Sequence, residues 1–261
     1  MKLELFQVDA FTDKLYSGNP AAVIPLEKWL PDNLMQTIAM ENNLSETVFY
    51  VPKGNDFHIR WFTPMIEVNL CGHATLAAAH VMYHHNDYEK PQINFHSLSG
   101  LLTVKRSGEM ITLNFPTDEP FKIEIPNVIV EAIGMRPVEV YKGRNVLLAV
   151  LNSQKEIETL NPEINLVAQA HPHGIIFTAN GEDVDFVSRC FFPNTGVNED
   201  PVTGSAHTIL TPYWAAKLNK SKLTAKQLSK RVGDLICELK GNRVEISGKA
   251  ITYMTSEIEV N

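Results

Sequence analysis

The chain has 261 residues, of which 44% are hydrophobic and 20% are charged, and its formal net charge at pH 7 is −7. This composition describes an ordinary globular protein that can bury a sizeable core, and the length favours two domains over one. The negative charge and the lack of a lysine- or arginine-rich cluster argue against nucleic acid as a partner. A small molecule is the expected ligand.

The apolar runs and the cysteines indicate the compartment. No segment approaches the roughly 20 apolar residues of a membrane helix, and residues 1–9 alternate like a strand instead of forming the apolar core of a signal peptide. The three cysteines, Cys71, Cys190 and Cys237, are odd in number and scattered, which fits free thiols in a reducing compartment. We expect a cytoplasmic protein without membrane contact and without disulfide bridges.

The first half of the chain is predicted to form strands around one helix. Strands are expected at 3–10, 21–25, 47–51, 57–62, 93–95, 101–106 and 111–115, and a first helix at 31–41. A second helix is expected to start at residues 71–75 and to end near residues 84–85. It is rich in alanine and apolar almost all round, which is typical of a central, buried helix.

The second half repeats this order of elements at low identity. Strands are expected at 145–151, 174–179, 184–192, 235–239 and 243–246, and helices at 162–170 and from Gly204-Ser205 onward. Two short stretches recur in the same order in both halves. In the first half, FTP at 62–64 precedes GHAT at 72–75, and in the second half, FP at 192–193 precedes GSA at 204–206. A repeat of this length indicates a duplicated fold.

We therefore predict an α+β tandem duplication, with a first repeat at 1–117 and a second at 118–250. Each half is expected to wrap a curved, mostly antiparallel, barrel-like sheet around one central helix, and the active site is expected between the halves. The strand at 251–258 has no place in the second repeat, so residues 251–261 are predicted to return to the first.

The starts of the two central helices are the expected site for a carboxylate. A helix N-terminus presents unpaired backbone N–H groups and a partial positive charge, both of which favour an anion. Gly72, Gly204 and Ser205 are small enough to let a ligand approach these groups. Ser205 adds a hydroxyl donor, and His73 projects an imidazole. The alternative is that these glycines and the serine only start helices, but two matching starts favour a functional cleft.

Glu46 is a carboxylate that the repeat does not duplicate, because alignment of the predicted strands places it opposite Gly174. With His73 and Asp200 it forms an acid/base set. A glutamate that moves protons near neutral pH needs burial or a neighbouring carboxylate to raise its pKa. The alternatives are that Glu46 is a solvated loop charge and that Asp200 only complements a helix dipole.

No metal or cofactor motif accompanies this set. Cys71, His73 and His80 lack the spacing of a zinc site. The chain contains no phosphate-binding glycine loop, no Gly-x-Ser-x-Gly elbow and no nicotinamide fingerprint. The sequence therefore predicts a reaction without a metal and without a cofactor.

Four motifs together resemble the PhzF family of phenazine biosynthesis and, more distantly, the diaminopimelate epimerase and proline racemase folds. They are GNPAAV at 18–23, LSET at 44–47, CGHAT at 71–75 and EDPVTGSA at 199–206. Each motif is weak alone. In this order they span nearly the whole chain, and four at these spacings are specific.

The resemblance implies the diaminopimelate epimerase-like fold, a homodimer, and an isomerase that moves a proton between carbons of a small cyclic or unsaturated amino or hydroxy acid. The founding substrate is trans-2,3-dihydro-3-hydroxyanthranilate, a cyclic amino acid. Carried over by position, Glu46 shuttles the proton, while His73 and Asp200 bind and orient the substrate and help to relay the proton. The remaining residues contact the substrate, with Asn19 lining the pocket and the carboxylate held by Gly72, Gly204 and Ser205.

Cys71 departs from the patterns of this fold. Two-base epimerases carry a cysteine before each helix-starting glycine, and here Cys71 fills the first position while Thr203 fills the second. Racemisation by two thiols is therefore not expected. Cys71 is either a small buried residue or a substrate contact. Two other functions stay open, a one-thiol amino-acid epimerase that uses Cys71 and a non-catalytic protein that binds a metabolite or a protein partner.

Overall fold

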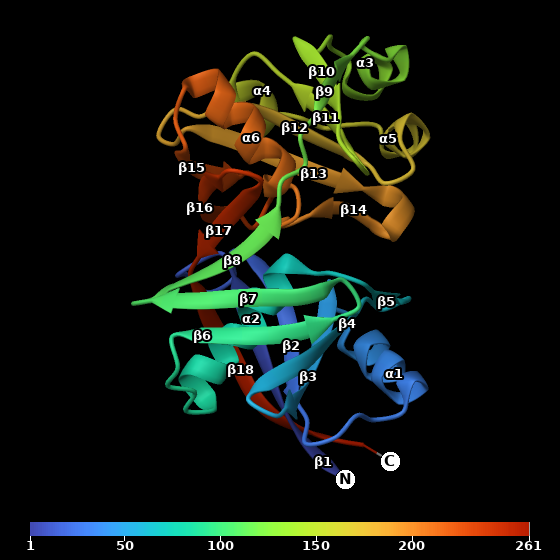
Figure 1. Ribbon diagram of the computed structural model, residues 1–261. Coiled ribbons are helices and arrows are strands. Elements are labelled where there is room, and N and C mark those ends of the chain that lie inside the picture. Colours follow the sequence, from blue (N-terminus) through green and yellow to red (C-terminus); the bar gives the residue numbers. More distant parts are fainter. Residues whose placement is uncertain (261) are drawn as a thin grey trace. The chain divides into compact units, whose positions relative to one another are not determined.

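The computed structural model describes residues 1–260, which divide into two compact units (Figure 1). The first unit consists of Met1–Asn114 and of the chain from Ser247 onward, and the second consists of Phe115–Ile246. Each unit combines strands with helices, so the fold is of the predicted α+β type. The repeat boundaries at 117 and 250 stay a prediction of where the duplicated sequences meet.

The first unit is built from strands that pair in sequence around two helices. The strands are β1 (Lys2–Ala10), β2 (Asn19–Pro25), β3 (Glu46–Lys53), β4 (Asp56–Phe62), β5 (Glu67–Val68), β6 (Gln92–Ser97), β7 (Gly100–Ser107), β8 (Met110–Pro116) and β18 (Ala250–Glu259). Helix α1 (Asp32–Asn42) connects β2 to β3, and helix α2 (Gly72–His85) connects β5 to β6.

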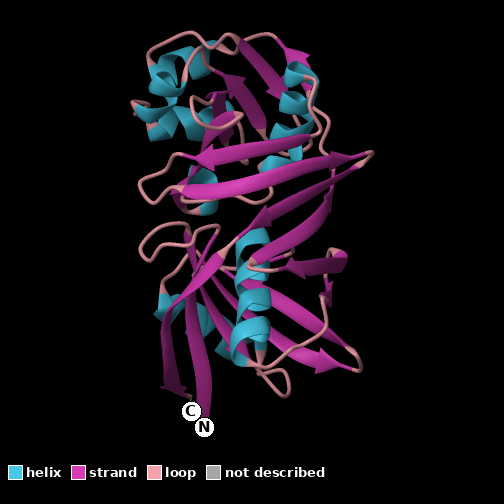
Figure 2. Ribbon diagram, turned by 90° about the vertical axis from the view of Figure 1, so that its left-hand side faces the viewer, coloured by secondary structure: helices cyan, strands magenta, loops and turns pink. Residues whose placement is uncertain are grey.

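Hydrogen-bonded pairing orders these strands as β18, β1, β2, β3, β4, β6, β7 and β8. The β2–β3 and β4–β6 pairs are parallel, and the other pairs are antiparallel. Both parallel pairs are joined through a helix, because parallel neighbours need a long crossover connection. The last strand pairs with the first along its length, from Lys2 opposite Glu259 to Ala10 opposite Ala250, so the two lie side by side (Figure 2).

Helix α2 is the buried centre of the first unit. Every residue from Gly72 to Tyr83 is buried, and the helix packs against β1, β2, β3 and β18. Figure 2 shows it running lengthwise beside the strands. Ala77, Ala78 and Ala79 are fully buried, and their small side chains allow the strands to approach closely. The central, buried helix predicted from the composition of this segment is confirmed.

The second unit repeats this plan. Its strands are β9 (Phe121–Ile123), β10 (Glu139–Lys142), β11 (Leu147–Val150), β12 (Ile175–Asn180), β13 (Phe186–Phe192), β14 (Val197–Asp200), β15 (Lys222–Gln227), β16 (Gly233–Lys240) and β17 (Arg243–Gly248). Its α-helices are α3 (Asn127–Ile133), α4 (Gln154–Glu158), α5 (Ile164–Ala170) and α6 (His207–Leu218).

The order of strand pairs in the second unit is β9, β10, β11, β12, β13, β15 and β16. The β11–β12 and β13–β15 pairs are parallel and the others in this series are antiparallel, as in the first unit. The edge positions correspond too, since β9 pairs antiparallel with β10 as β18 does with β1. The matching series confirms the predicted tandem duplication.

The pairing registers of the two units can be compared with the alignment predicted from the sequence. Thr47 pairs with Phe62 in the first unit, as Ile175 pairs with Phe191 in the second. Likewise, Phe57 pairs with Phe95 in the first unit, as Phe186 pairs with Ala225 in the second. These pairs are compatible with the predicted alignment of residues 47–51 with residues 175–179, in which Glu46 stands opposite Gly174.

The structure contains elements that the sequence patterns did not predict. Among them, α3 has seven residues, α4 five and β10 four. Segments of this length are too short to express a helical or strand period clearly. Among residues 1–260, no helix combines the length and the apolar character needed to cross a membrane.

Candidate active site

The first unit brings together Asn19, Glu46, Cys71 and His73. Asn19 begins β2, Glu46 begins β3, and Cys71 is the residue before α2. Because β2 and β3 are parallel neighbours, with Ala21 opposite Glu46, their first residues lie at the same end of the sheet. The predicted site residues of this half of the chain therefore form one cluster.

The turn before β2 requires glycine. Gly18 has a φ of +64°, and a Cβ at this position would lie 2.2 Å from the carbonyl oxygen of Ala10. A side chain is therefore excluded, and the backbone conformation is one that glycine adopts readily. The next residue, Asn19, is fully buried. The Gly-Asn pair of the first motif thus sets where the Asn19 side chain enters the cluster.

His73 is the centre of this cluster. Its Nε2 atom lies 3.0 Å from Oε2 of Glu46, which is an ion-pair distance. On the other side of the ring, Nδ1 lies 3.2 Å from Nδ2 of Asn19 and 3.5 Å from Sγ of Cys71. The side chain of His73 is 5% exposed and that of Glu46 is 17% exposed. The imidazole is therefore sealed off, while the carboxylate keeps some access from outside.

The charges in the cluster follow from burial and from the neighbouring groups. Burial alone lowers the pKa of His73, but Cys71 and Glu46 outweigh it and hold the pKa of His73 well above its usual value. Burial also raises the pKa of Cys71 to about 11, and the charge of Glu46 adds to this shift. Since the thiol keeps its proton at neutral pH, we assign the negative charge that stabilises the His73 imidazolium to Glu46.

The second unit has no room for a carboxylate at the position equivalent to Glu46. Gly174 has a φ of +112°, and a Cβ there would lie 2.1 Å from the carbonyl oxygen of Phe191 and 2.6 Å from the ring of Phe192. A side chain would push against backbone atoms that cannot rotate away. The asymmetry between the halves therefore has a steric cause.

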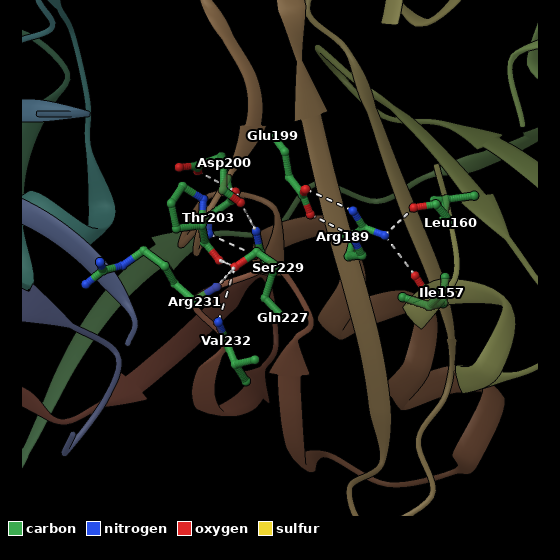
Figure 3. A network of polar contacts seen from close by, with 11 residues as sticks. Ile157, Leu160, Arg189, Glu199, Asp200, Thr203, Gln227, Ser229, Arg231 and Val232 are labelled. Carbon is green, nitrogen blue, oxygen red and sulfur yellow. Dashed lines mark hydrogen bonds and ion pairs between the residues drawn. The ribbon is translucent and has the colours of Figure 1, made fainter. Parts of the chain in front are cut away.

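In the second unit, Asp200 belongs to a hydrogen-bond network centred on Gln227 (Figure 3). Thr203 donates its hydroxyl proton to Oδ2 of Asp200 at 2.5 Å. The fully buried Gln227 accepts the backbone N–H of Thr203 at 2.8 Å and donates to the backbone carbonyl of Asp200 at 2.7 Å. These bonds fix the loop from 200 to 203 and the direction of its carboxylate.

Two further contacts anchor this loop, as Figure 3 shows. Arg189 makes a two-point ion pair with Glu199, at 2.6 and 2.9 Å, and also donates to two backbone carbonyls at 2.6 and 3.1 Å. Paired guanidinium–carboxylate bonds of this kind restrict orientation as well as distance. Ser229 donates its hydroxyl proton to the carbonyl of Pro201 at 2.8 Å.

Arg189, Gln227 and Ser229 were not among the site residues predicted from the sequence. The signal for Gln227 lies in its strand, where Leu223, Ala225 and Gln227 alternate and all three are buried. A polar side chain at an inward position of such an alternation needs buried hydrogen-bond partners. Had β15 been predicted, this glutamine would have stood out as a candidate.

The start of the second central helix differs from the expectation. Helix α6 begins at His207, not at Gly204, because residues 204–206 form a tight turn. In this turn His207 N–H donates to the Gly204 carbonyl and Thr208 N–H to that of Ser205, each at 3.1 Å. Gly204 is buried and Ser205 is exposed. Helix α2 begins at Gly72, as predicted.

His207 is a buried histidine for which the sequence predicted no role. Its Nδ1–H donates to the carbonyl of Thr203 at 2.9 Å, so it supports the same loop as Gln227. Burial lowers the pKa of His207 to about 4, which keeps the ring neutral at physiological pH.

Comparison with known proteins places these features in a family. A family model described as phenazine biosynthesis-like protein, PhzC-PhzF, matches residues 8–256. The chain belongs to the PhzC-PhzF family. The resemblance predicted from four motifs is therefore confirmed, over almost the whole chain.

Relatives of this PhzC-PhzF protein agree with the predicted fold and enzyme class. An uncharacterized isomerase of Pseudomonas aeruginosa is 48% identical over 260 residues, which cover 100% of each chain. A crystal structure of a PhzF-family phenazine biosynthesis protein from Enterococcus faecalis has a TM-score of 0.97 at 45% identity and 100% coverage of both chains. A hydroxyproline epimerase from Agrobacterium vitis has a TM-score of 0.64 at 10% identity, over 98% of this chain and 92% of that one. The last match shows a shared epimerase-like fold.

Proposed function

We propose that this protein moves a proton between two carbons of a small cyclic or unsaturated amino or hydroxy acid, with Glu46 as both base and acid. The observation that carries the proposal is the contact of 3.0 Å between Glu46 and the buried His73. The raised pKa of His73 keeps an imidazolium beside Glu46. A positioned carboxylate with partial exposure is suited to accept a proton from a carbon acid.

In this reaction Glu46 takes up one proton from the substrate and returns one proton to it. The carboxylate of Glu46 removes a proton from one carbon, and the electron pair of that C–H bond moves into the conjugated system of the substrate. The protonated Glu46 then returns the proton to a different carbon. The product has the same atoms and the same oxidation level as the substrate. We propose that the imidazolium of His73 orients the carboxylate and stabilises the negative charge on the intermediate.

The other residues are proposed to bind the substrate. Backbone N–H groups at Gly72, the first residue of α2, and at Gly204 and Ser205, in the turn before α6, would hold its carboxylate, since helix starts favour anions. Asp200, oriented by Thr203, would accept a hydrogen bond from an amino or hydroxyl group of the substrate. Support for these roles comes from the family motifs.

Asn19 and Cys71 are proposed to line the pocket beside His73, at 3.2 and 3.5 Å from its Nδ1 atom. We further propose that the protein works as a cytoplasmic homodimer. Light scattering of the purified protein tests the oligomeric state.

Proton NMR in deuterated water tests the proposed reaction. A panel of cyclic and unsaturated amino and hydroxy acids, led by trans-2,3-dihydro-3-hydroxyanthranilate, is incubated with the wild type and with Glu46→Gln. We expect rearrangement or deuterium incorporation at a carbon with the wild type and neither with the variant. Equal turnover by both proteins would end the proposal. Ligand binding without any reaction would favour the non-catalytic alternative.

A one-thiol epimerase is the second candidate, because Sγ of Cys71 lies 3.5 Å from His73. The chemistry of the thiol argues against it, since the reactive form is the thiolate and burial raises the pKa of Cys71 to about 11. Alkylation of the protein separates the two candidates. Loss of turnover on alkylation and in Cys71→Ala would favour the epimerase, and indifference to both would exclude it.

A further inference from the structure

Glu46, Cys71 and His73 form a set of donors that fits a metal ion. One ligating atom from each residue, a carboxylate oxygen, a thiol sulfur and a ring nitrogen, lies within 4.8 Å of the other two. Cysteine, histidine and carboxylate are the ligands that Zn²⁺ prefers in proteins, and three protein ligands with one open position are a common zinc arrangement. The sequence has no metal-site spacing that joins these three residues, because Glu46 lies in a different element from the Cys-Gly-His stretch.

The spacing of these atoms is close to that of a tetrahedral site. Bond lengths of about 2.3 Å to sulfur and about 2.0 Å to nitrogen and oxygen imply ligand-to-ligand distances of roughly 3.2–3.6 Å. The contact of His73 with Glu46, at 3.0 Å, lies just below this range, and its contact with Cys71, at 3.5 Å, lies within it. His73 presents a different ring nitrogen to each partner, so a metal on one nitrogen requires the other partner to move by about an ångström. Coordination through Nε2 leaves Glu46 in place, and rotation of the Cys71 side chain provides the movement.

Two buried atoms of the cluster lack hydrogen bonds. Oε2 of Glu46 and Nε2 of His73 face each other at 3.0 Å but are not aligned for a hydrogen bond, and neither has another partner among residues 1–260. The two atoms form an ion pair with each other, but buried polar atoms without a well-aligned hydrogen bond are uncommon in folded proteins. A shared metal ion would satisfy both atoms at once.

The charge of the complex also suits a buried site. A thiolate and a carboxylate together neutralise a divalent cation, and a neutral assembly avoids the cost of an isolated charge in a protein interior. On coordination the thiol of Cys71 and the imidazolium of His73 each release one proton to solvent, because a metal binds the thiolate and the neutral imidazole. No oxidant or reductant is involved.

We propose that a thiophilic divalent cation such as Zn²⁺ binds Glu46, Cys71 and His73 and thereby inhibits the enzyme. The binding rests on the geometry of the cluster alone, whereas the inhibition rests on the proposed function of Glu46. A carboxylate bound to a metal has its lone pair and its charge engaged, so it cannot remove a proton from carbon.

Cobalt spectroscopy tests the binding directly. Co²⁺ takes the place of Zn²⁺ in tetrahedral sites, and a cobalt–thiolate bond gives a charge-transfer band in the near ultraviolet. We expect this band when Co²⁺ is added to the wild type, and we expect Zn²⁺ to displace it at one equivalent. The band should be absent in Cys71→Ala. The affinity for Zn²⁺ should fall by more than about 10-fold in Glu46→Gln, because loss of a ligand costs more than loss of an outer partner.

A double variant of the exposed histidines at the end of α2, His84→Ala with His85→Ala, is the matched control. These residues can attract metal through imidazole, but they offer no thiolate. The control should keep the band and the one-equivalent displacement. Circular dichroism and thermal melting establish that every variant is folded. A folded wild type without the band, or a band that persists in Cys71→Ala, would overturn the proposed site.

Turnover in the presence of Zn²⁺ tests the second part of the proposal. We expect Zn²⁺ to suppress turnover of the wild type at the concentrations that displace Co²⁺ and a chelator to restore it. Stimulation by Zn²⁺ would overturn the inhibitory role. The two ideas fail separately, because normal turnover by Glu46→Gln would refute the proposed function while the cobalt band would still report the site.

Discussion

Replacement of Glu46 by glutamine removes the proposed base and keeps the shape of the side chain. General acid–base catalysis by one positioned group contributes about 10²- to 10⁴-fold to a rate. Since Glu46 is proposed both to remove the proton and to return it, we expect kcat to fall by about 10³-fold or more. Substrate affinity should change little, because the contacts assigned to the carboxylate of the substrate lie elsewhere.

The same substitution has a cost in stability that the structure allows us to estimate. Loss of one partner of a buried ion pair costs about 3–5 kcal/mol, whereas an exposed pair contributes about 0–1 kcal/mol. Glu46 is 17% exposed, and His73 can release its proton once the carboxylate is gone. We therefore expect a loss of about 1–3 kcal/mol in the free energy of unfolding.

The sign of the pH dependence follows from the raised pKa of His73. Stabilisation by the pair is fully present below the unfolded-state pKa of about 6.5 and is lost as the pH rises through the higher folded-state pKa. The difference in stability between the wild type and Glu46→Gln should therefore shrink at alkaline pH. Urea denaturation at several pH values measures it.

Asp56→Asn provides a matched control, because Asp56 is another carboxylate next to a histidine in the first unit. Its Oδ2 atom lies 3.1 Å from Nε2 of His96, and the two side chains are 33% and 36% exposed. We expect this variant to keep its turnover and to lose less stability than Glu46→Gln. Wild-type kcat in Glu46→Gln, or an equal loss in both variants, would refute the reasoning.

Three further outcomes follow from the second unit. Gly174→Ala should lower the free energy of unfolding by about 2–4 kcal/mol, because its Cβ would lie 2.1 Å from a carbonyl oxygen at a φ of +112°; an unchanged melting temperature would contradict this account. Gln227→Leu removes the hydrogen-bond partners of Thr203 N–H and of the Asp200 carbonyl, which should lower the free energy of unfolding by about 1–3 kcal/mol for each unpaired group. The loop from 200 to 203 should loosen and KM should rise, whereas a folded variant with wild-type KM would show that the loop holds without Gln227. Burial lowers the pKa of His207 to about 4, so the stability that is present above pH ~6.5 falls by on the order of 3 kcal/mol as the pH drops toward 4. His207→Gln should flatten that part of an acid-unfolding curve, and an identical curve would contradict the assignment.

The sequence by itself determined the long elements and their repetition. The alanine-rich run that became α2 is apolar on every side, and such a pattern leaves a helix nowhere to lie except inside the sheet. The sequence also showed that the second half has no counterpart to Glu46, because the strands at 47–51 and 174–179 can be aligned from the order of their apolar residues alone. These properties depend on neighbouring residues along the chain, which is why a single sequence reveals them.

Only the tertiary structure decided which polar groups touch. The contact between Glu46 and His73 joins the start of a strand to the first turn of a helix, and the protonated state of Cys71 follows from its burial there. In the second unit, Gln227 holds Asp200 from a distant strand. Such contacts are set by strand register and by the packing of α2, and neither leaves a periodic signal in the residues that it brings together.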